Sequence, residues 1–278
     1  MKYESLCFSG GGIKGIMHLG ALSELNERDL LDVKEVSGTS VGSIIATAIA
    51  MKYSMHTILN LLFEINFKDN MTIDIVNFLQ TKGISSIDSI KNLVVELITI
   101  ENKHDVTFLE LYNKTNIELH ICSTDIDNFV PYYFNYSKTP EVKIIDAILA
   151  SVSIPFIFPP VNINDKKYVD GILTDDIPYG ILKNKDDMLI FCFDKEPENT
   201  KDEDTVISYI KKIFMCTVQS YYNRIFENVN KNKIVVFEID NSLVNKNLDS
   251  LFDIDIDDKM TLFYNGKKQI IKFLNNLN

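Results

Sequence analysis

Ser40 lies at the centre of a G-x-S-x-G motif that runs from Gly38 to Gly42. The motif follows a short apolar stretch and precedes an uncharged segment, rich in Ile and Ala, from Val41 to Met51. A strand that turns sharply into a helix at such a serine exposes the hydroxyl, and the N-terminus of the helix favours negative charge beside it. The motif therefore predicts a nucleophile elbow with Ser40 as the nucleophile. On its own, the same pattern is equally typical of an ordinary strand-to-helix turn.

A glycine-rich loop lies upstream, in the sequence G-G-G-I-K-G from Gly10 to Gly15. It follows an expected strand over Tyr3–Phe8 and precedes an amphipathic helix with Ile and Leu at helical spacing. Three successive glycines at the start of a helix expose backbone N–H groups that can bind an anion. The sequence leaves open whether that anion is a phosphate or a transient oxyanion.

The same loop offers an alternative function, because Gly10, Gly12 and Gly15 match the dinucleotide fingerprint G-x-G-x-x-G. A dinucleotide-binding oxidoreductase needs an acidic residue at the end of its second strand to hold the ribose. Here that strand ends in the serine elbow, and the nearby acids Asp32 and Glu35 precede it. The dinucleotide interpretation is therefore the less favoured one.

A serine nucleophile also needs a base, which is most often a histidine. The chain has four histidines, His18, His56, His104 and His120. His18 falls within the first expected helix, and His120 falls within an expected strand, so both are interpreted as structural residues. Asp170 is the better candidate for the base, since it ends a short strand in the sequence K-Y-V-D-G. An Asp-Gly pair taken alone is far more often an ordinary turn.

Taken together, the motifs resemble the patatin-like phospholipase family in order and spacing. The resemblance rests on four segments: Gly10–Gly15, Gly38–Gly42, the A-S-x-S-I-P-x-x-F-P-P block at Ala150–Pro160, and Asp170–Gly171. The last third of the chain also resembles the family in outline, with a strand near Lys233–Ile239 and a closing helix from Lys259 onward. Each motif is weak singly, but their conjunction is specific.

This resemblance implies a serine acyl-hydrolase with a Ser–Asp dyad and no cofactor, on a three-layer α/β/α sandwich with a mostly parallel sheet. Ser40 would be the nucleophile, Asp170 the base, and the N–H groups of Gly10, Gly11 and Gly12 the oxyanion hole. Residues in supporting roles would be Lys14, Gly15, Gly38, Gly42 and Gly171. The implied reaction is phospholipase A-type cleavage of glycerophospholipid esters at a membrane or micelle surface, with any protein activator unknown. The alternative is a non-catalytic descendant of the fold that binds lipid or a partner.

Two positions depart from the family pattern. Ile172 stands where relatives usually have Gly or Ala, and it would be strained if that position required a positive φ. Asp176 stands where relatives often carry Asn, and its charge would raise the pKa of Asp170 if the two carboxylates faced each other. The interpretation favoured here is that Asp175 and Asp176 cap the following helical turn.

Composition favours a globular enzyme formed by one domain over residues 1–278. The chain is 46% hydrophobic and 24% charged, and its alternating strands and helices predict an α/β fold. Neither a signal peptide nor an apolar run of about 20 residues, the length that spans a bilayer, is recognised. We therefore expect a cytoplasmic protein that is peripheral at membranes.

The net charge of −11 disfavours nucleic acid as a partner and also disfavours electrostatic attachment to anionic membranes. Two apolar segments are candidates for lipid contact: Met51–Leu79, which would wall an acyl-chain groove, and a helical stripe within Ile207–Val229. For both segments, a helix that faces the core is the favoured explanation.

The cysteines and acidic residues give no sign of a metal site in the sequence. Cys7, Cys122 and Cys192 fall in expected strands, which predicts reduced, buried thiols. Cys and His residues lack zinc spacing, and the acidic stretch at Asp253–Asp258 lacks the glycine and the terminal Glu of an EF-hand loop.

Overall fold

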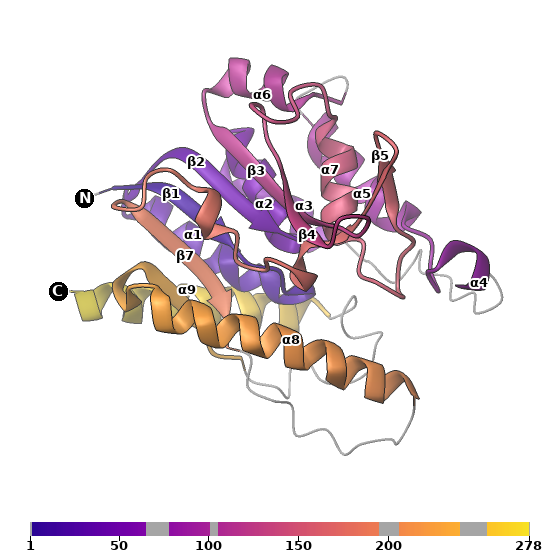
Figure 1. Ribbon diagram of the computed structural model, residues 1–278. Helices are drawn as coiled ribbons and strands as arrows, with labels where there is room; N and C mark the ends of the chain where they lie inside the picture. Colours follow the sequence, from indigo (N-terminus) through magenta and orange to yellow (C-terminus); the bar gives the residue numbers. More distant parts are fainter. Residues whose placement is uncertain (1, 65–77, 101–104, 195–205, 240–254, 278) are drawn as a thin grey trace.

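The computed structural model describes residues 2–64, 78–100, 105–194, 206–239 and 255–277, and within them an eight-stranded sheet separates two layers of helices (Figure 1). The strands are β1 Tyr3–Phe8, β2 Leu31–Thr39, β3 Glu118–Asp125, β4 Val130–Phe134, β5 Val161–Ile163, β6 Lys166–Asp170, β7 Met188–Phe193 and β8 Ile234–Phe237. The helices are α1 Ile16–Glu27, α2 Val41–Ala50, α3 Met55–Glu64, α4 Phe78–Thr81, α5 Asp88–Thr99, α6 Phe108–Thr115, α7 Ile144–Val152, α8 Val206–Asn228 and α9 Ile256–Leu277.

The sheet has the strand order β5-β6-β3-β2-β1-β7-β8, with β4 paired to β3 outside this path. The strands β3, β2, β1, β7 and β8 pair with one another in parallel. The strands β4 and β6 pair with β3, and β5 pairs with β6, in antiparallel fashion. Parallel strands need helical crossovers, which place helices on the faces of the sheet. The predicted α/β sandwich with a mostly parallel sheet is confirmed.

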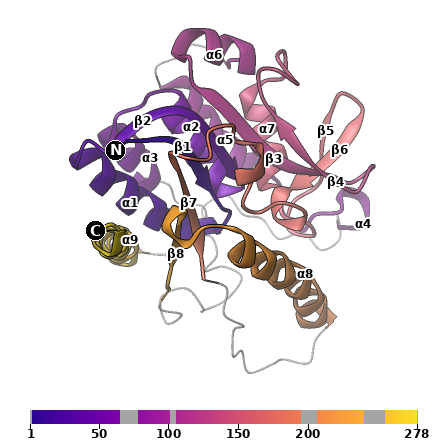
Figure 2. The same cartoon turned by 60° about the vertical axis from the view of Figure 1, so that its left-hand side comes forward.

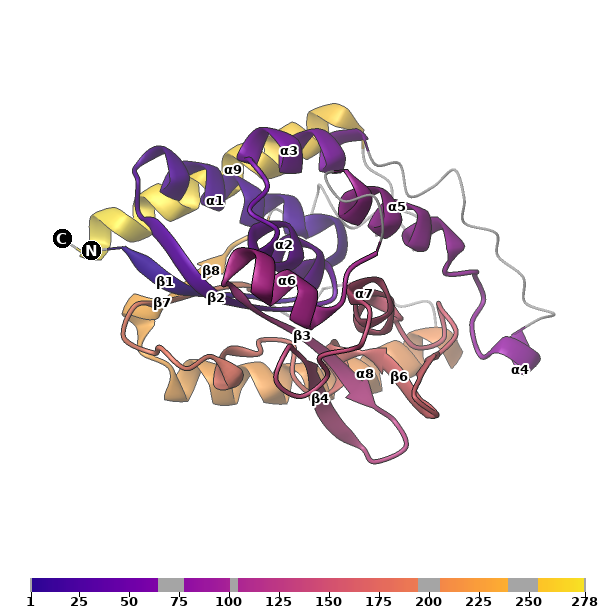
Figure 3. The ribbon, with the colours of Figure 1, turned by 90° about the horizontal axis from the view of Figure 1, so that it is seen from above.

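Both faces of the sheet are covered, so its central strands are apolar on both sides. In β7, Leu189 and Phe191 join the larger core, which packs under α1, α2, α7 and α9. Ile190 and Cys192 point the other way and pack against α8. Figure 3 shows α8 on one side of the sheet and α1, α2 and α9 on the other. Cys7, Cys122 and Cys192 are buried free thiols, as predicted.

The two segments considered for lipid contact are only partly described. Of Met51–Leu79, the structure describes α3 and the start of α4, and residues 65–77 lie outside the described residues. On α8, Val218 and Ile225 are buried against the sheet, which confirms the core-facing interpretation for this part of the stripe. Among the helices of the described residues, none combines the length and the apolar character that a membrane crossing needs.

The closing helix α9 lies along α1, and two glycines set how closely the helices approach (Figure 2). A Cβ at Gly20 would lie 1.9 Å from the carbonyl oxygen of Phe263. A Cβ at Gly266 would lie 2.1 Å from the carbonyl oxygen of Met17. Both contacts are with backbone atoms, which cannot rotate away, so the contact requires glycine at both positions.

We expect Gly266→Ala to destabilise the fold, because the added methyl forces α9 away from α1. Overpacking of this kind typically costs about 1–3 kcal/mol. In a chain of this size the loss should lower Tm by roughly 2–10 °C. Gly180→Ala is the matched control, because a Cβ at Gly180 would meet nothing within 4 Å. Calorimetry on both variants checks the expectation, and equal Tm values would contradict it.

Candidate active site

Ser40 has the backbone conformation of a nucleophile elbow. It lies between the last residue of β2 and the first residue of α2, with φ 55° and ψ −127°. Non-glycine residues rarely adopt a positive φ, and such strain persists only where the surroundings enforce it. Here the N–H of Ser40 donates to Ser151 Oγ at 2.9 Å, and that hydroxyl donates to the carbonyl oxygen of Cys122 at 2.6 Å. Ser151, from the A-S-x-S-I-P block, therefore holds the elbow in place.

The positions on either side of Ser40, Gly38 and Gly42, have no room for a side chain. A Cβ at Gly38 would lie 2.2 Å from the carbonyl oxygen of Gly42. A Cβ at Gly42 would lie 2.4 Å from the carbonyl oxygen of Phe8, in the neighbouring strand β1. The predicted close approach of the chain at Gly38 and Gly42 is confirmed.

The glycine-rich loop lies directly beside the elbow. The strands β1 and β2 are parallel, with Phe8 opposite Gly38, so their carboxyl ends lie at the same end of the sheet. A Cβ at Gly10 would lie 3.2 Å from Ser40 Cβ, and a Cβ at Gly15 would lie 2.6 Å from a methyl group of Val41. Within the loop, the N–H of Lys14 donates to the carbonyl oxygen of Gly11 at 3.2 Å. The glycine-rich loop and the elbow, which are 23 or more residues apart in the sequence, are therefore in direct contact.

The register of β3 with its neighbours brings Asp170 to the same end of the sheet. Both β2 and β4 pair with residues 121 and 122 of β3, so these strands lie on opposite edges of it. Since β4 also pairs with residues 123–125, β6 must share the edge that β2 uses. On that edge Thr39 lies opposite Cys122, and Asp170 lies opposite Ser123. Along β3, the pairing with β6 therefore starts at the residue directly after the last one that pairs with β2, next to the turn at Ser40.

The carboxyl group of Asp170 is buried and oriented by its own turn. Its side chain is part of a residue only 1% exposed, and Oδ1 accepts a hydrogen bond from the N–H of Ile172 at 2.9 Å. The following residues form a 3-10 turn, Gly171–Leu173, in which Ile172 does not have a positive φ. The strain considered for Ile172 therefore does not arise.

The acidic pair Asp175 and Asp176 does not cap a helix, so that expectation was wrong. Asp176 Oδ1 accepts a hydrogen bond from the N–H of Gly10 at 2.9 Å, and Asp176 Oδ2 accepts one from the hydroxyl of Tyr222 at 2.5 Å. Asp176 thus connects α8 to the glycine-rich loop. Because the N–H of Gly10 is already used by Asp176, the candidate oxyanion donors narrow to Gly11 and Gly12.

Asp175 lies beside this connection and accepts hydrogen bonds from the hydroxyls of Tyr133 and Tyr221. Burial raises the pKa of the Asp175 carboxyl, although both tyrosine hydrogen bonds act to lower it. Its carbonyl oxygen accepts a hydrogen bond from Thr39 Oγ1 at 2.9 Å, one residue before Ser40. The two tyrosines of α8, at adjacent positions, therefore hold both neighbouring acids.

Neither buried histidine lies where the base is expected. His18 packs among Phe8, Phe191 and Phe193, and burial lowers its pKa to about 3. His120 lies opposite Ser37 on β3, three residues back along the strand from the position of Asp170. Burial lowers the pKa of His120 to about 4.

The family model for patatin-like phospholipases matches residues 6–183, which include the elbow, the glycine-rich loop and the Asp170 turn. This chain belongs to the patatin-like phospholipase family. The match covers more than half of the sequence and ends just after the acidic pair.

Curated relatives of this chain include viral and fungal proteins. The chain is 29% identical to the uncharacterized protein R571 of Acanthamoeba polyphaga mimivirus, over 99% of this chain and 96% of that protein. It is 26% identical to the probable lipid hydrolase 463L of Invertebrate iridescent virus 6, over 96% of this chain and 87% of that protein. It is 31% identical to triacylglycerol lipase 4 of Saccharomyces cerevisiae, over 64% of this chain but only 22% of that lipase. The names of the second and third of these relatives support lipid hydrolysis.

Two solved structures share the fold. VipD from Legionella pneumophila aligns with a TM-score of 0.62 at 17% identity, over 99% of this chain and 67% of that chain. The type III effector ExoU of Pseudomonas aeruginosa aligns with a TM-score of 0.56 at 17% identity, over 99% of this chain and 53% of that chain. The aligned region thus spans about half of ExoU.

We expect Tyr222→Phe to destabilise the protein, because Asp176 loses one of its hydrogen-bond donors in a buried site. A hydrogen bond to a charged group typically contributes about 1.5–3 kcal/mol. Tyr179→Phe is the matched control, because no hydrogen bond involves the Tyr179 hydroxyl within the described part of the chain. Urea unfolding of both variants measures the difference. A midpoint for Tyr222→Phe that equals the control would contradict the connection through Asp176.

Proposed function

We propose that this protein cleaves fatty-acyl esters of glycerophospholipids by a phospholipase A-type reaction, with Ser40 as nucleophile and Asp170 as base. The N–H groups of Gly11 and Gly12 are the proposed oxyanion hole. The observation that carries the proposal is the register of β3, in which Asp170 occupies the next position along the edge after Thr39. This register puts the carboxylate of Asp170 beside the strand end that leads into Ser40, and membership in the patatin-like family supports the assignment.

The reaction follows from these roles. Ser40 Oγ attacks the ester carbonyl carbon while its proton passes to the carboxylate of Asp170, and the oxyanion accepts hydrogen bonds from the glycine-rich loop. The ester C–O bond then breaks, and the leaving alcohol takes the proton from Asp170. Water repeats the sequence on the acyl-enzyme, which releases the fatty acid and restores Ser40.

The contacts of Asp176 argue against the dinucleotide alternative. A pyrophosphate bound at the glycine-rich loop would need the free N–H groups at its start. The N–H of Gly10 instead donates to the carboxylate of Asp176, and that buried acid would repel a phosphate. A non-catalytic relative would keep the same fold, so kinetic tests decide between it and the enzyme.

We expect Ser40→Ala to remain folded and to lose ester hydrolysis, because it removes only the attacking oxygen. Hydrolysis of a soluble 4-nitrophenyl ester and of phosphatidylcholine in mixed micelles measures the effect, with circular dichroism as the check on folding. Ser23→Ala, at an exposed serine-to-glutamate hydrogen bond of α1, is the control and should keep full activity. Folded Ser40→Ala that still hydrolyses both substrates would exclude the serine mechanism.

Asp170→Asn tests the base, since it keeps the size of the side chain and removes its ability to accept a proton. General base catalysis typically contributes about 10²–10⁴-fold, so kcat should fall by that factor while KM changes little. Asp186→Asn, at a fully exposed aspartate, is the matched control. If Asp170→Asn kept wild-type kcat, the assignment of the base would be wrong even if Ser40 remained essential.

The same micelle assay on triacylglycerol separates the proposed substrate from a neutral lipid. The yeast relatives are named triacylglycerol lipases, so this comparison is the relevant one. A kcat/KM for triacylglycerol above that for phosphatidylcholine would replace the phospholipid assignment and leave the dyad intact.

A further inference from the structure

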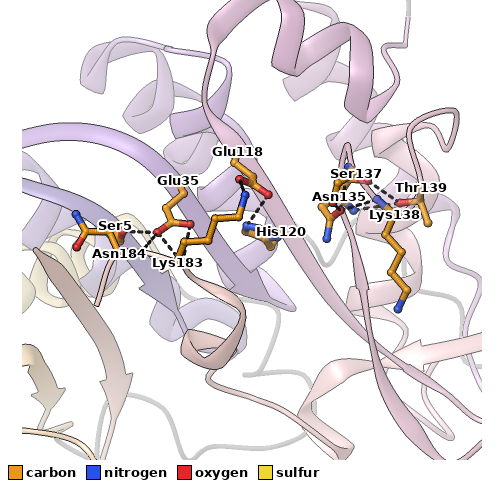
Figure 4. A network of polar contacts seen from close by, with 10 residues as sticks. All are labelled: Ser5, Glu35, Glu118, His120, Asn135, Ser137, Lys138, Thr139, Lys183 and Asn184. Carbon is orange, nitrogen blue, oxygen red and sulfur yellow. Dashed lines mark hydrogen bonds and ion pairs between the residues drawn. The ribbon is translucent and has the colours of Figure 1, made fainter. Parts of the chain in front are cut away.

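A second cluster of ionisable side chains lies on the same sheet, away from Ser40. Glu35 of β2 is opposite Glu118 of β3, and His120 lies two residues further along β3 on the same face. Figure 4 shows the three side chains together, next to the segment that carries Lys183. We call these three residues the Glu35–Glu118–His120 cluster.

The atoms of this cluster that can bind a cation are close together and buried. One carboxylate oxygen of each glutamate and one ring nitrogen of His120 all lie within 4.8 Å of one another. His120 Nε2 is 3.6 Å from Glu118 Oε1. Each of the three residues is less than 9% exposed.

The carboxylate of Glu35 is held in a fixed orientation. Glu35 Oε1 accepts hydrogen bonds from Ser5 Oγ at 2.6 Å and from the N–H of Asn184 at 2.7 Å. The N–H of Lys183 donates to both oxygens of Glu35, at 2.9 and 3.0 Å. Burial alone would raise the pKa of Glu35, but these hydrogen bonds lower it, so the group is a carboxylate at neutral pH.

His120 is a buried polar group without a hydrogen bond. Neither of its ring nitrogens has a hydrogen-bond partner among the residues that the structure describes. Burial lowers the pKa of His120 to about 4, although Glu118 and Glu35 act to raise it, so the ring is neutral at pH 7. Buried polar groups are nearly always satisfied, and an exception points to a bound water or ion. A neutral imidazole directed at two carboxylates is suited to bind a metal.

One cation already contacts the cluster, from a side chain that is mostly exposed to solvent. Lys183 Nζ lies 2.5 Å from Glu118 Oε2, while the Lys183 side chain is 67% exposed. The Lys183 ammonium can turn into solvent, and a bound dication would then replace it as the partner of the buried Glu118 carboxylate. Two carboxylates and one lysine also leave a net negative charge at the site.

We propose that the Glu35–Glu118–His120 cluster binds a transition-metal dication of the zinc class, which displaces the Lys183 ammonium. A ligand set of one imidazole nitrogen and two carboxylate oxygens suits Zn²⁺, with water in the remaining position, whereas Mg²⁺ and Ca²⁺ prefer oxygen alone. In tetrahedral coordination the ligand atoms are about 3.4 Å apart, so small side-chain rotations close the site. The ligands come from β2 and β3, and the bound metal links these strands.

This site is separate from the proposed esterase chemistry. Glu35 lies on β2 five residues before Ser40, and His120 lies opposite Ser37, three residues before it, which corresponds to roughly 16 Å and 10 Å along a strand. The metal therefore has no contact with the ester, and hydrolysis is expected to survive treatment with EDTA. The proposal stands or falls independently of the function of Ser40.

Titration calorimetry with ZnCl₂ on chelator-treated protein tests the site. The wild type should bind one equivalent, and Zn²⁺ should raise its Tm. Losing even a residue that only orients a ligand typically costs about 10–100-fold in metal affinity, so His120→Gln should weaken binding by at least about tenfold. His56→Gln, at an exposed histidine of α3, is the matched control and should bind as the wild type does. Equal titrations for wild type and folded His120→Gln would overturn the proposal.

Lys183→Met is the second variant, and it keeps the buried groups intact. Because the lysine competes with the metal, its removal should tighten Zn²⁺ binding by about threefold or more. A merely structural cluster would show no such gain. If Lys183→Met bound Zn²⁺ no more tightly than the wild type, the proposed displacement would be wrong. This test does not require His120→Gln to fold.

Discussion

The candidate active site depends on one strand edge that is shared by two strands of opposite direction. β2 pairs with the first part of β3 and stops at Thr39, and β6 takes over the same edge at Asp170. The elbow needs β2 to end there, since α2 begins directly after Ser40. A shift of β6 by one residue would turn the Asp170 side chain to the other face of the sheet, because side chains alternate along a strand. The position of Asp170 beside the end of β2 is therefore a consequence of register.

The glycine-rich loop depends on charge as well as on backbone shape. The carboxylate of Asp176 accepts one hydrogen bond from the N–H of Gly10 and another from the hydroxyl of Tyr222. The helix α8 therefore has two roles: it covers the second face of the sheet, and it supplies the tyrosine that binds Asp176. The same helix holds Asp175 through Tyr221. Packing of α8 and the position of the loop beside Ser40 are thus linked through two acids.

Local sequence patterns were sufficient to predict strands, helices and turns. They did not predict the contacts between residues that are far apart in the sequence. The strand Tyr3–Phe8, the elbow at Ser40 and the buried cysteines follow from apolar periodicity and glycine placement, which act over a few residues. The roles of Ser151 and Asp176 depend on partners more than 100 residues away. Likewise, Glu35 and His120 are 85 residues apart and meet only because β2 and β3 pair in parallel. Propensity and motif spacing carry no information about such pairings, and the capping role expected for Asp175 and Asp176 failed for this reason.

The central claim is that the strained serine of the elbow is a nucleophile. Treatment with a fluorophosphonate, followed by peptide mapping in a mass spectrometer, tests it most directly, because the reagent reacts with activated serine hydroxyls and needs no assumption about the lipid. The account predicts one stoichiometric adduct, on the peptide that contains Ser40 and on Ser40 itself. A folded protein that acquires no adduct, or that acquires it on another serine, would contradict the account.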